Sequence, residues 1–159
     1  MIELANYSDL EEIAKLAVKV RTHMLHGGLK QWTGDYPNVD VFLNDYHRQG
    51  LYIYKEDGHI IASISILHEN EEAYREISWL KNHSLVIHRV LVDPEHQKQG
   101  IGLELFNFAK AIGVKNKYSS IKVDTHPDNF KMQGLIRKAG YKEIGYLSNI
   151  NRLAYELVL

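Results

Sequence analysis

Apolar residues follow a helical period in the first part of the chain. Between Leu10 and Met24 they recur at intervals of three and four residues, which predicts a helix that ends before Gly27-Gly28. The run Ser8-Asp9-Leu10-Glu11 has the spacing of a capping box at the start of this helix. A short strand is expected before it, over residues 2–5, so the chain begins with a strand and an amphipathic helix.

Period-two alternation and turn residues predict the strands. Residues 51–55 and 60–67 form two apolar runs joined by Glu56-Asp57-Gly58, a strong hairpin signal. Further strands are expected over residues 86–92, 120–125, 141–146 and 152–159, and further helices after a cap at Asn38 or Asp40, from 100 to 114, and from a cap at Asp128 or Asn129 to Ala139. The resulting order, β-α-α-β-β-β-α-β-α-β-β, predicts an α/β domain with a mixed sheet.

Length and composition narrow the class of protein. The 159 residues suffice for one domain with a real core, so we expect a single domain over residues 1–159. A formal net charge of −1 without a basic run does not suggest a nucleic-acid partner. There is no cysteine, which excludes disulfides, thiolate metal sites and a cysteine nucleophile. Neither a signal peptide nor a membrane-spanning run is recognisable, so a cytoplasmic protein without a membrane partner is expected.

The segment from Val86 to Ala109 carries the strongest candidate chemistry. The apolar strand Val86–Val92 ends at Asp93-Pro94, and Gln97-Lys98-Gln99-Gly100-Ile101-Gly102 leads into a helix. Glycines let the backbone approach a ligand closely, and the first N–H groups of a helix point their positive dipole end at it. This pattern predicts a cradle for a phosphate or pyrophosphate. A glycine-rich turn without a ligand is the simpler alternative.

The details of the cradle choose among nucleotide-binding folds. It lacks the Gly-Lys-Ser/Thr of a P-loop, and its Gly-x-Gly is not followed by the third Rossmann glycine. The motif Gln-x-x-Gly-x-Gly after a strand ending in Val-Asp-Pro instead resembles the acetyl-CoA site of the GCN5-related N-acetyltransferases, the GNAT family. The element order is also similar to the GNAT (acyl-CoA N-acyltransferase) fold, a mixed, mostly antiparallel sheet flanked by helices.

The resemblance implies a set of functional residues and acetyl-CoA as cosubstrate, with no metal. In the family the strand of residues 86–92 holds the pantetheine arm, so the N–H of Val90 would face the thioester carbonyl, a catalytic role. The exposed Lys98 is also interpretable as a solvated side chain, and Asn129, which would reach the pantetheine arm, as a helix cap. The implied cofactor-binding positions are Val90, Leu91, Val92, Gln97, Lys98, Gln99, Gly100, Ile101, Gly102, Leu103 and Asn129.

One position departs from the family pattern. Many members carry a tyrosine seven residues after the asparagine, where it can protonate the leaving thiolate, but this chain has Ile136 there. Gly140-Tyr141 matches the Gly-Phe/Tyr that follows the same helix, although we favour the structural explanation of a helix stop with a core aromatic residue. By residue type alone, Tyr118, Tyr141 and Tyr146 could replace the acid. Water could also serve, because a thiol with a pKa of about 8–9 leaves without an acid.

His88 is the sharpest candidate for a general base. Histidine suits proton transfer near neutral pH, and family members often place a base at this point of the strand. Strict alternation would put His88 on the same face as Val90 and Val92, and opposite Arg89. The alternative is a histidine that only makes a structural hydrogen bond.

The other histidines give weaker signals. His126 follows a strand end near the expected position of the cofactor thiol and could also belong to the site. His23 and His26 lie three residues apart on a predicted helix end, but no third ligand is evident, so a metal site is not expected.

The acceptor is not spelled out by the sequence. The loop with Trp32 and Tyr36 and the acidic insertion of residues 68–82 occupy regions that shape the acceptor pocket in this family. An acidic lip would favour a cationic amine such as a polyamine, an aminoglycoside or a lysine side chain. A solvated charged loop is the alternative.

Together these features predict an acetyl-CoA-dependent N-acetyltransferase. It would move an acetyl group to a primary amine, of a small molecule in preference to a protein, by direct attack in a ternary complex. The alternatives are a catalytically inactive acyl-CoA-binding sensor, suggested by Ile136, and an acetyltransferase acting on a protein N-terminus or lysine. A homodimer is compatible with the family.

Overall fold

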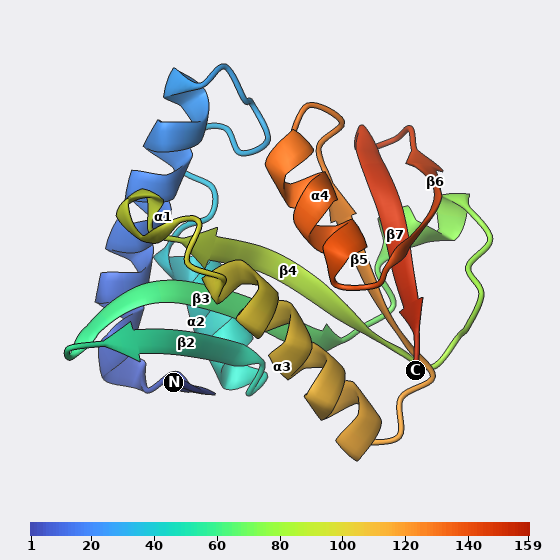
Figure 1. Ribbon diagram of the computed structural model, residues 1–159, viewed down its shortest axis with the longest axis horizontal. Helices are drawn as coiled ribbons and strands as arrows, with labels where there is room; N and C mark the ends of the chain where they lie inside the picture. Colours follow the sequence, from blue (N-terminus) through green and yellow to red (C-terminus); the bar gives the residue numbers. More distant parts are fainter. The chain divides into compact units, whose positions relative to one another are not determined.

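The chain forms a seven-stranded mixed sheet with four α-helices. A computed structural model describes residues 1–159 (Figure 1). The strands are hydrogen-bonded in the order β1-β2-β3-β4-β5-β7-β6. The strands are β1 (Ile2–Leu4), β2 (Leu51–Glu56), β3 (His59–His68), β4 (Ser84–Val92), β5 (Ser120–Thr125), β6 (Lys142–Leu147) and β7 (Arg152–Val158). The helices are α1 (Leu10–His26), α2 (Val39–His47), α3 (Ile101–Lys115) and α4 (Phe130–Lys138), with 3-10 turns η1 (Tyr7–Asp9), η2 (Glu72–Glu76) and η3 (Pro94–His96).

The residues group into two compact units. The first contains residues 1–67 and 88–105, and the second contains residues 68–87 and 106–159. Strand β4 and helix α3 each contribute residues to both. The expectation of one domain stays a prediction.

The first unit joins the antiparallel strands β1, β2 and β3 to α1 and α2. The β2–β3 turn has positive φ at both Asp57 and Gly58, as a tight two-residue hairpin turn requires. The apolar stripe of α1 packs into a core with α2, β2 and Leu91 of β4. The capping box predicted at Ser8–Glu11 is wrong: the N–H of Asn6 donates to Asp9 Oδ2 at 2.8 Å, so the capping carboxylate belongs to the preceding turn η1.

The second unit contains the antiparallel strands β5, β7 and β6 and helix α4. The start of β4 pairs with β5 in parallel, with Ser84 opposite Ser120 and Val86 opposite Lys122. Asn129 is the N-cap of α4 and accepts a hydrogen bond from the N–H of Met132 at 3.1 Å. The acidic insertion folds into the short turn η2. No helix of the protein combines the length and the apolar character that a membrane crossing requires.

Candidate active site

Strand β4 contains a left-handed residue in its second half. Arg89 has a φ of 51°, which an L-residue rarely adopts within a strand. A left-handed residue interrupts the regular pleat of a strand. The prediction that His88 lies on the face of Val90 and Val92 assumes unbroken alternation, and it stays a prediction.

A buried ion pair holds the Arg89 side chain. Its Nε and Nη2 donate to Asp45 Oδ2 and Oδ1 at 2.6 and 2.7 Å, a bidentate arrangement with a side chain that is 0% exposed. Ser65 Oγ donates to the same carboxylate at 2.6 Å, and Arg89 Nη1 donates to the Tyr36 hydroxyl at 3.0 Å. Burial opposes the guanidinium charge, but Asp45 outweighs this effect and the pKa of Arg89 is raised. The network links Arg89 of β4 to α2 and β3.

Asp93 fixes the chain where β4 ends and the cradle begins. Its carboxylate accepts from the N–H of Glu95 at 2.9 Å and pairs with Lys19 of α1 at 2.9 Å. Its own N–H donates to the carbonyl of Ile61 at 2.8 Å. Burial alone would raise the pKa of Asp93, but the Glu95 N–H and the Lys19 ammonium lower it below its usual value.

The cradle has the backbone of an anion site. Lys98 and Gly100 have φ of 64° and 81°, and α3 begins directly afterwards at Ile101. The first helical N–H groups lack intrahelical partners, and no hydrogen bond from a loop or neighbouring element uses the N–H groups of residues 97–103. Alternating left-handed residues turn successive N–H groups toward one concave side. These residues therefore fit a pyrophosphate.

The predicted site residues divide between the two units. His88, Val90, Leu91, Val92 and the cradle residues 97–103 belong to the first unit, and Asn129 belongs to the second. His88 is partly buried, whereas Val90 and Leu91 are buried. Within its own unit Asn129 is buried and caps α4, so the predicted capping role is confirmed.

A buried apolar residue occupies position 136, where the family resemblance would place a tyrosine. Ile136 is 0% exposed and offers no proton. Of the three candidate substitutes, the Tyr118 hydroxyl contacts His68 Nδ1 at 3.1 Å, and the Tyr146 hydroxyl donates to Asn151 at 2.6 Å. The Tyr141 hydroxyl is buried without a hydrogen-bond partner, and burial raises the pKa of this phenol well above its usual value.

His126 and the loop with Trp32 and Tyr36 were also candidates from the sequence, and each makes contacts that stabilise the fold. His126 Nδ1 accepts from the N–H of Asp128 at 3.0 Å, and its carbonyl accepts from the N–H of Asn129 at 2.9 Å, so His126 organises the turn before α4. Trp32 is buried in the core of the first unit, whereas Tyr36 contacts Arg89.

Two charged residues that the fold partly buries, Arg89 and Lys122, were not singled out from the sequence. The signal was present, because Arg89 and Lys122 each interrupt an apolar strand, where a charged side chain needs a partner or a cavity. Their surroundings come from segments far away along the chain, which periodicity alone does not reveal.

Comparison with known proteins decides the family. The family model described as the acetyltransferase (GNAT) family matches residues 18–141, most of the chain and all of the β4–α3 segment. This chain belongs to the GNAT acetyltransferase family. Among curated protein sequences, none matches it.

Solved GNAT structures share the fold over the full length. A GNAT-family acetyltransferase from Streptococcus agalactiae superposes with a TM-score of 0.87 at 25% identity, covering 100% of this chain and 95% of that one. For a putative acetyltransferase from Staphylococcus aureus the values are 0.78 and 28%, covering 99% and 98%. The PaiA N-acetyltransferase from Thermoplasma acidophilum, solved in complex with coenzyme A, superposes at 0.80 with 16% identity, covering 100% and 98%. The predicted family and fold are therefore confirmed.

Proposed function

We propose that this GNAT protein is an acetyl-CoA-dependent N-acetyltransferase that acetylates a primary amine of a small molecule by direct attack. The observation that carries the proposal is the cradle, in which left-handed Lys98 and Gly100 precede the N-terminus of α3. The coenzyme A bound to the Thermoplasma acidophilum neighbour supports the same ligand here.

The cradle and strand β4 would share the work of holding the cosubstrate. Backbone N–H groups of residues 97–103 would bind the pyrophosphate, where the positive end of the α3 dipole also favours an anion. Backbone groups of Leu91 and Val92 would bond the amides of the pantetheine arm.

Acetyl-CoA supplies the acetyl group as an activated thioester. The N–H of Val90 would donate to the carbonyl oxygen, where negative charge develops as the amine attacks. A fixed donor is worth more than a mobile one, and the ion pair with the buried Asp45 would hold Arg89, the residue that precedes Val90, in place. Arg89 and Asp45 are thus positioning residues in this proposal.

His88 would accept a proton from the substrate ammonium, directly or through water, and so give the neutral amine that attacks. The departing thiolate has no tyrosine at position 136 to protonate it, so we assign that proton to water. A thiol with a pKa of about 8–9 is a tolerable leaving group without a side-chain acid.

An acetylation assay tests the proposal. Purified protein is incubated with acetyl-CoA and a panel of primary amines, and thiol release is measured together with the thermal stability gained from acetyl-CoA alone. We expect both a stability gain and turnover on at least one amine. A stability gain without turnover on amines, peptides or proteins would favour the sensor, for which the buried Ile136 speaks. The absence of both the stability gain and turnover would contradict the proposal.

A further inference from the structure

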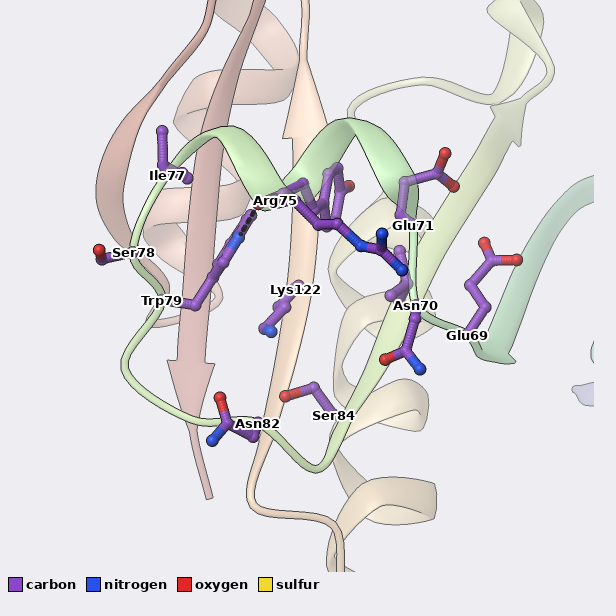
Figure 2. A pocket seen from close by; sticks show the side chains of 12 residues that line it. Glu69, Asn70, Glu71, Arg75, Ile77, Ser78, Trp79, Asn82, Ser84 and Lys122 are labelled. Atoms are coloured by element: carbon purple, nitrogen blue, oxygen red, sulfur yellow. Dashed lines mark hydrogen bonds between the residues drawn. The ribbon is translucent and has the colours of Figure 1, made fainter.

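The second unit contains a cavity, and none of the residues that line it belongs to the cradle. It has a volume of about 410 Å³ and lies against the start of β4 and against β5, where Ser84, Val86 and Lys122 line it. Residues of the acidic insertion form its other walls (Figure 2). This volume is in the range of small-molecule sites, roughly 300–1,000 Å³.

The part of the acidic insertion that lines the cavity, residues 69–82, is held in place by hydrogen bonds at three points. The Tyr74 hydroxyl donates to Asp124 at 2.5 Å. Glu76 accepts from the N–H groups of Ser148 and Asn149 at 2.8 and 3.0 Å. The buried Glu156 accepts from the N–H groups of Leu80 and Lys81 at 2.7 and 3.1 Å. The cavity is therefore built into the fold of this unit.

Lys122 brings a positive charge into the cavity without a carboxylate partner. Its ammonium lies 4.9 Å from the centre of the Trp79 ring. The carboxylate that acts on it electrostatically, Glu156, is already occupied by Ser120 and by two backbone N–H groups. A partly buried ammonium beside an aromatic ring, with a nearby carboxylate that is already hydrogen-bonded to other groups, is suited to bind an anionic group.

The cavity also has an acidic end. Figure 2 shows Glu69 and Glu71 together on one side, with the Arg75 side chain extending toward them from η2. A polyamine would meet the positive charges of Lys122 and Arg75, and a plain carboxylic acid would meet the two carboxylates. Only a ligand that carries both charges complements the whole lining.

We propose that this cavity binds a small zwitterion, a free amino acid, with its carboxylate at Lys122 and its ammonium at the Glu69–Glu71 end. This assignment replaces the purely cationic amine expected from the acidic insertion. A free amino acid carries a primary amine, so its use as acetyl acceptor rests on the proposed function. Its binding does not, because it needs no acetyl-CoA.

Ligand-observed NMR on the full chain tests the inference. The twenty L-amino acids are screened without acetyl-CoA, and each one that binds is compared with its decarboxylated amine and with its deaminated acid. For leucine these probes are isopentylamine and 4-methylpentanoate. We expect the amino acid to bind and both analogues to bind at least about tenfold more weakly, since each loses a charged hydrogen bond.

Two variants locate the binding. Lys122→Met retains the stem over Trp79 but removes the charge, and it should weaken amino-acid binding about tenfold or more. Lys131→Met, on the exposed surface of α4, should leave it unchanged. Acetyl-CoA binding is measured on the same samples, so that a loss of cosubstrate binding is distinguished from a loss of amino-acid binding.

Three outcomes overturn the inference. One is that no amino acid binds to protein that still binds acetyl-CoA. Another is that the decarboxylated amine binds as tightly as the amino acid. The third is that Lys122→Met binds like Lys131→Met.

Discussion

At the residue scale, the geometry of the candidate active site depends on charged side chains in unusual surroundings. Arg89 combines a left-handed backbone with a guanidinium held by a fully buried carboxylate. The strand around Arg89 was predictable from its apolar neighbours. Its partner Asp45 was not, because it lies 44 residues earlier, on the helix α2.

Removing the charge of Asp45 should therefore be costly. We expect Asp45→Asn to lower the free energy of unfolding by about 3–5 kcal/mol, because it leaves a buried guanidinium without its counter-charge. Urea denaturation measures this change. Asp40→Asn, on the exposed side of the same helix, is the matched control and should cost a few tenths of a kcal/mol. Equal effects of the two substitutions would show that the pair is not important for stability.

His88 is the second test at this scale. We expect His88→Ala to lower kcat by about 10²–10⁴-fold and to change its pH profile, with acetyl-CoA affinity unchanged, because the side chain acts only on the proton of the amine. Steady-state kinetics and calorimetry measure the two quantities. His59→Ala, at the exposed start of β3, is a matched control. Unchanged turnover would remove His88 from the mechanism.

Asp93 gives a pH-dependent prediction. Its pKa is lowered in the folded protein, so its stabilisation is full above the unfolded pKa of 3.8 and is lost as the pH falls through the lower, folded pKa. Asp93→Asn should therefore reduce the free energy of unfolding by about 1 kcal/mol at pH 7. The difference between the two proteins should shrink below pH 3.8. A difference that is the same at both pH values would contradict the role of the charge.

At the element scale, the helices and strands follow local signals. The apolar stripe and Gly27 located α1, and turn residues located the β2–β3 hairpin, because both depend on neighbours in sequence. The left-handed Arg89 in β4 was missed, since a period-two pattern does not reveal positive φ at a non-glycine residue. The cradle was predictable because glycines and a helix start mark it directly.

Helix α4 offers a stability test for this scale. Gly134 lies on its exposed side, and a Cβ added there would meet no atom within 4 Å. Gly134→Ala should raise the free energy of unfolding by about 0.5–1 kcal/mol, because alanine restricts the unfolded chain and favours the helix. Gly140→Ala, just after the same helix at a φ of 99°, should instead destabilise the protein. Thermal denaturation of both variants checks the opposite signs.

At the scale of the whole molecule, the proposed cofactor site and the candidate ligand cavity differ in how far each could be predicted from the sequence. The proposed cofactor-binding motif is contiguous, so the residues from Gln97 to Leu103 indicated acetyl-CoA without a structure. The candidate ligand cavity combines Glu71, Ser84 and Lys122 from separate segments. Its mixed charge is a property of the fold and could not be obtained from the acidic insertion alone.

The affinity of Gly100→Val for acetyl-CoA tests whether the cosubstrate binds in the cradle. Gly100 has a φ of 81°, and a valine there would be strained and would distort the N–H groups before α3. Gly58→Val is the matched control, because this hairpin glycine has a φ of 80° and equally open space around it.

Both variants are first shown to unfold cooperatively. Their affinities for acetyl-CoA are then measured by calorimetric titration. The account predicts that Gly100→Val binds acetyl-CoA about tenfold or more weakly than the wild type, since charged hydrogen bonds to the pyrophosphate are lost, while Gly58→Val binds normally. A folded Gly100→Val protein with wild-type affinity for acetyl-CoA would contradict the placement of the cofactor in this cradle.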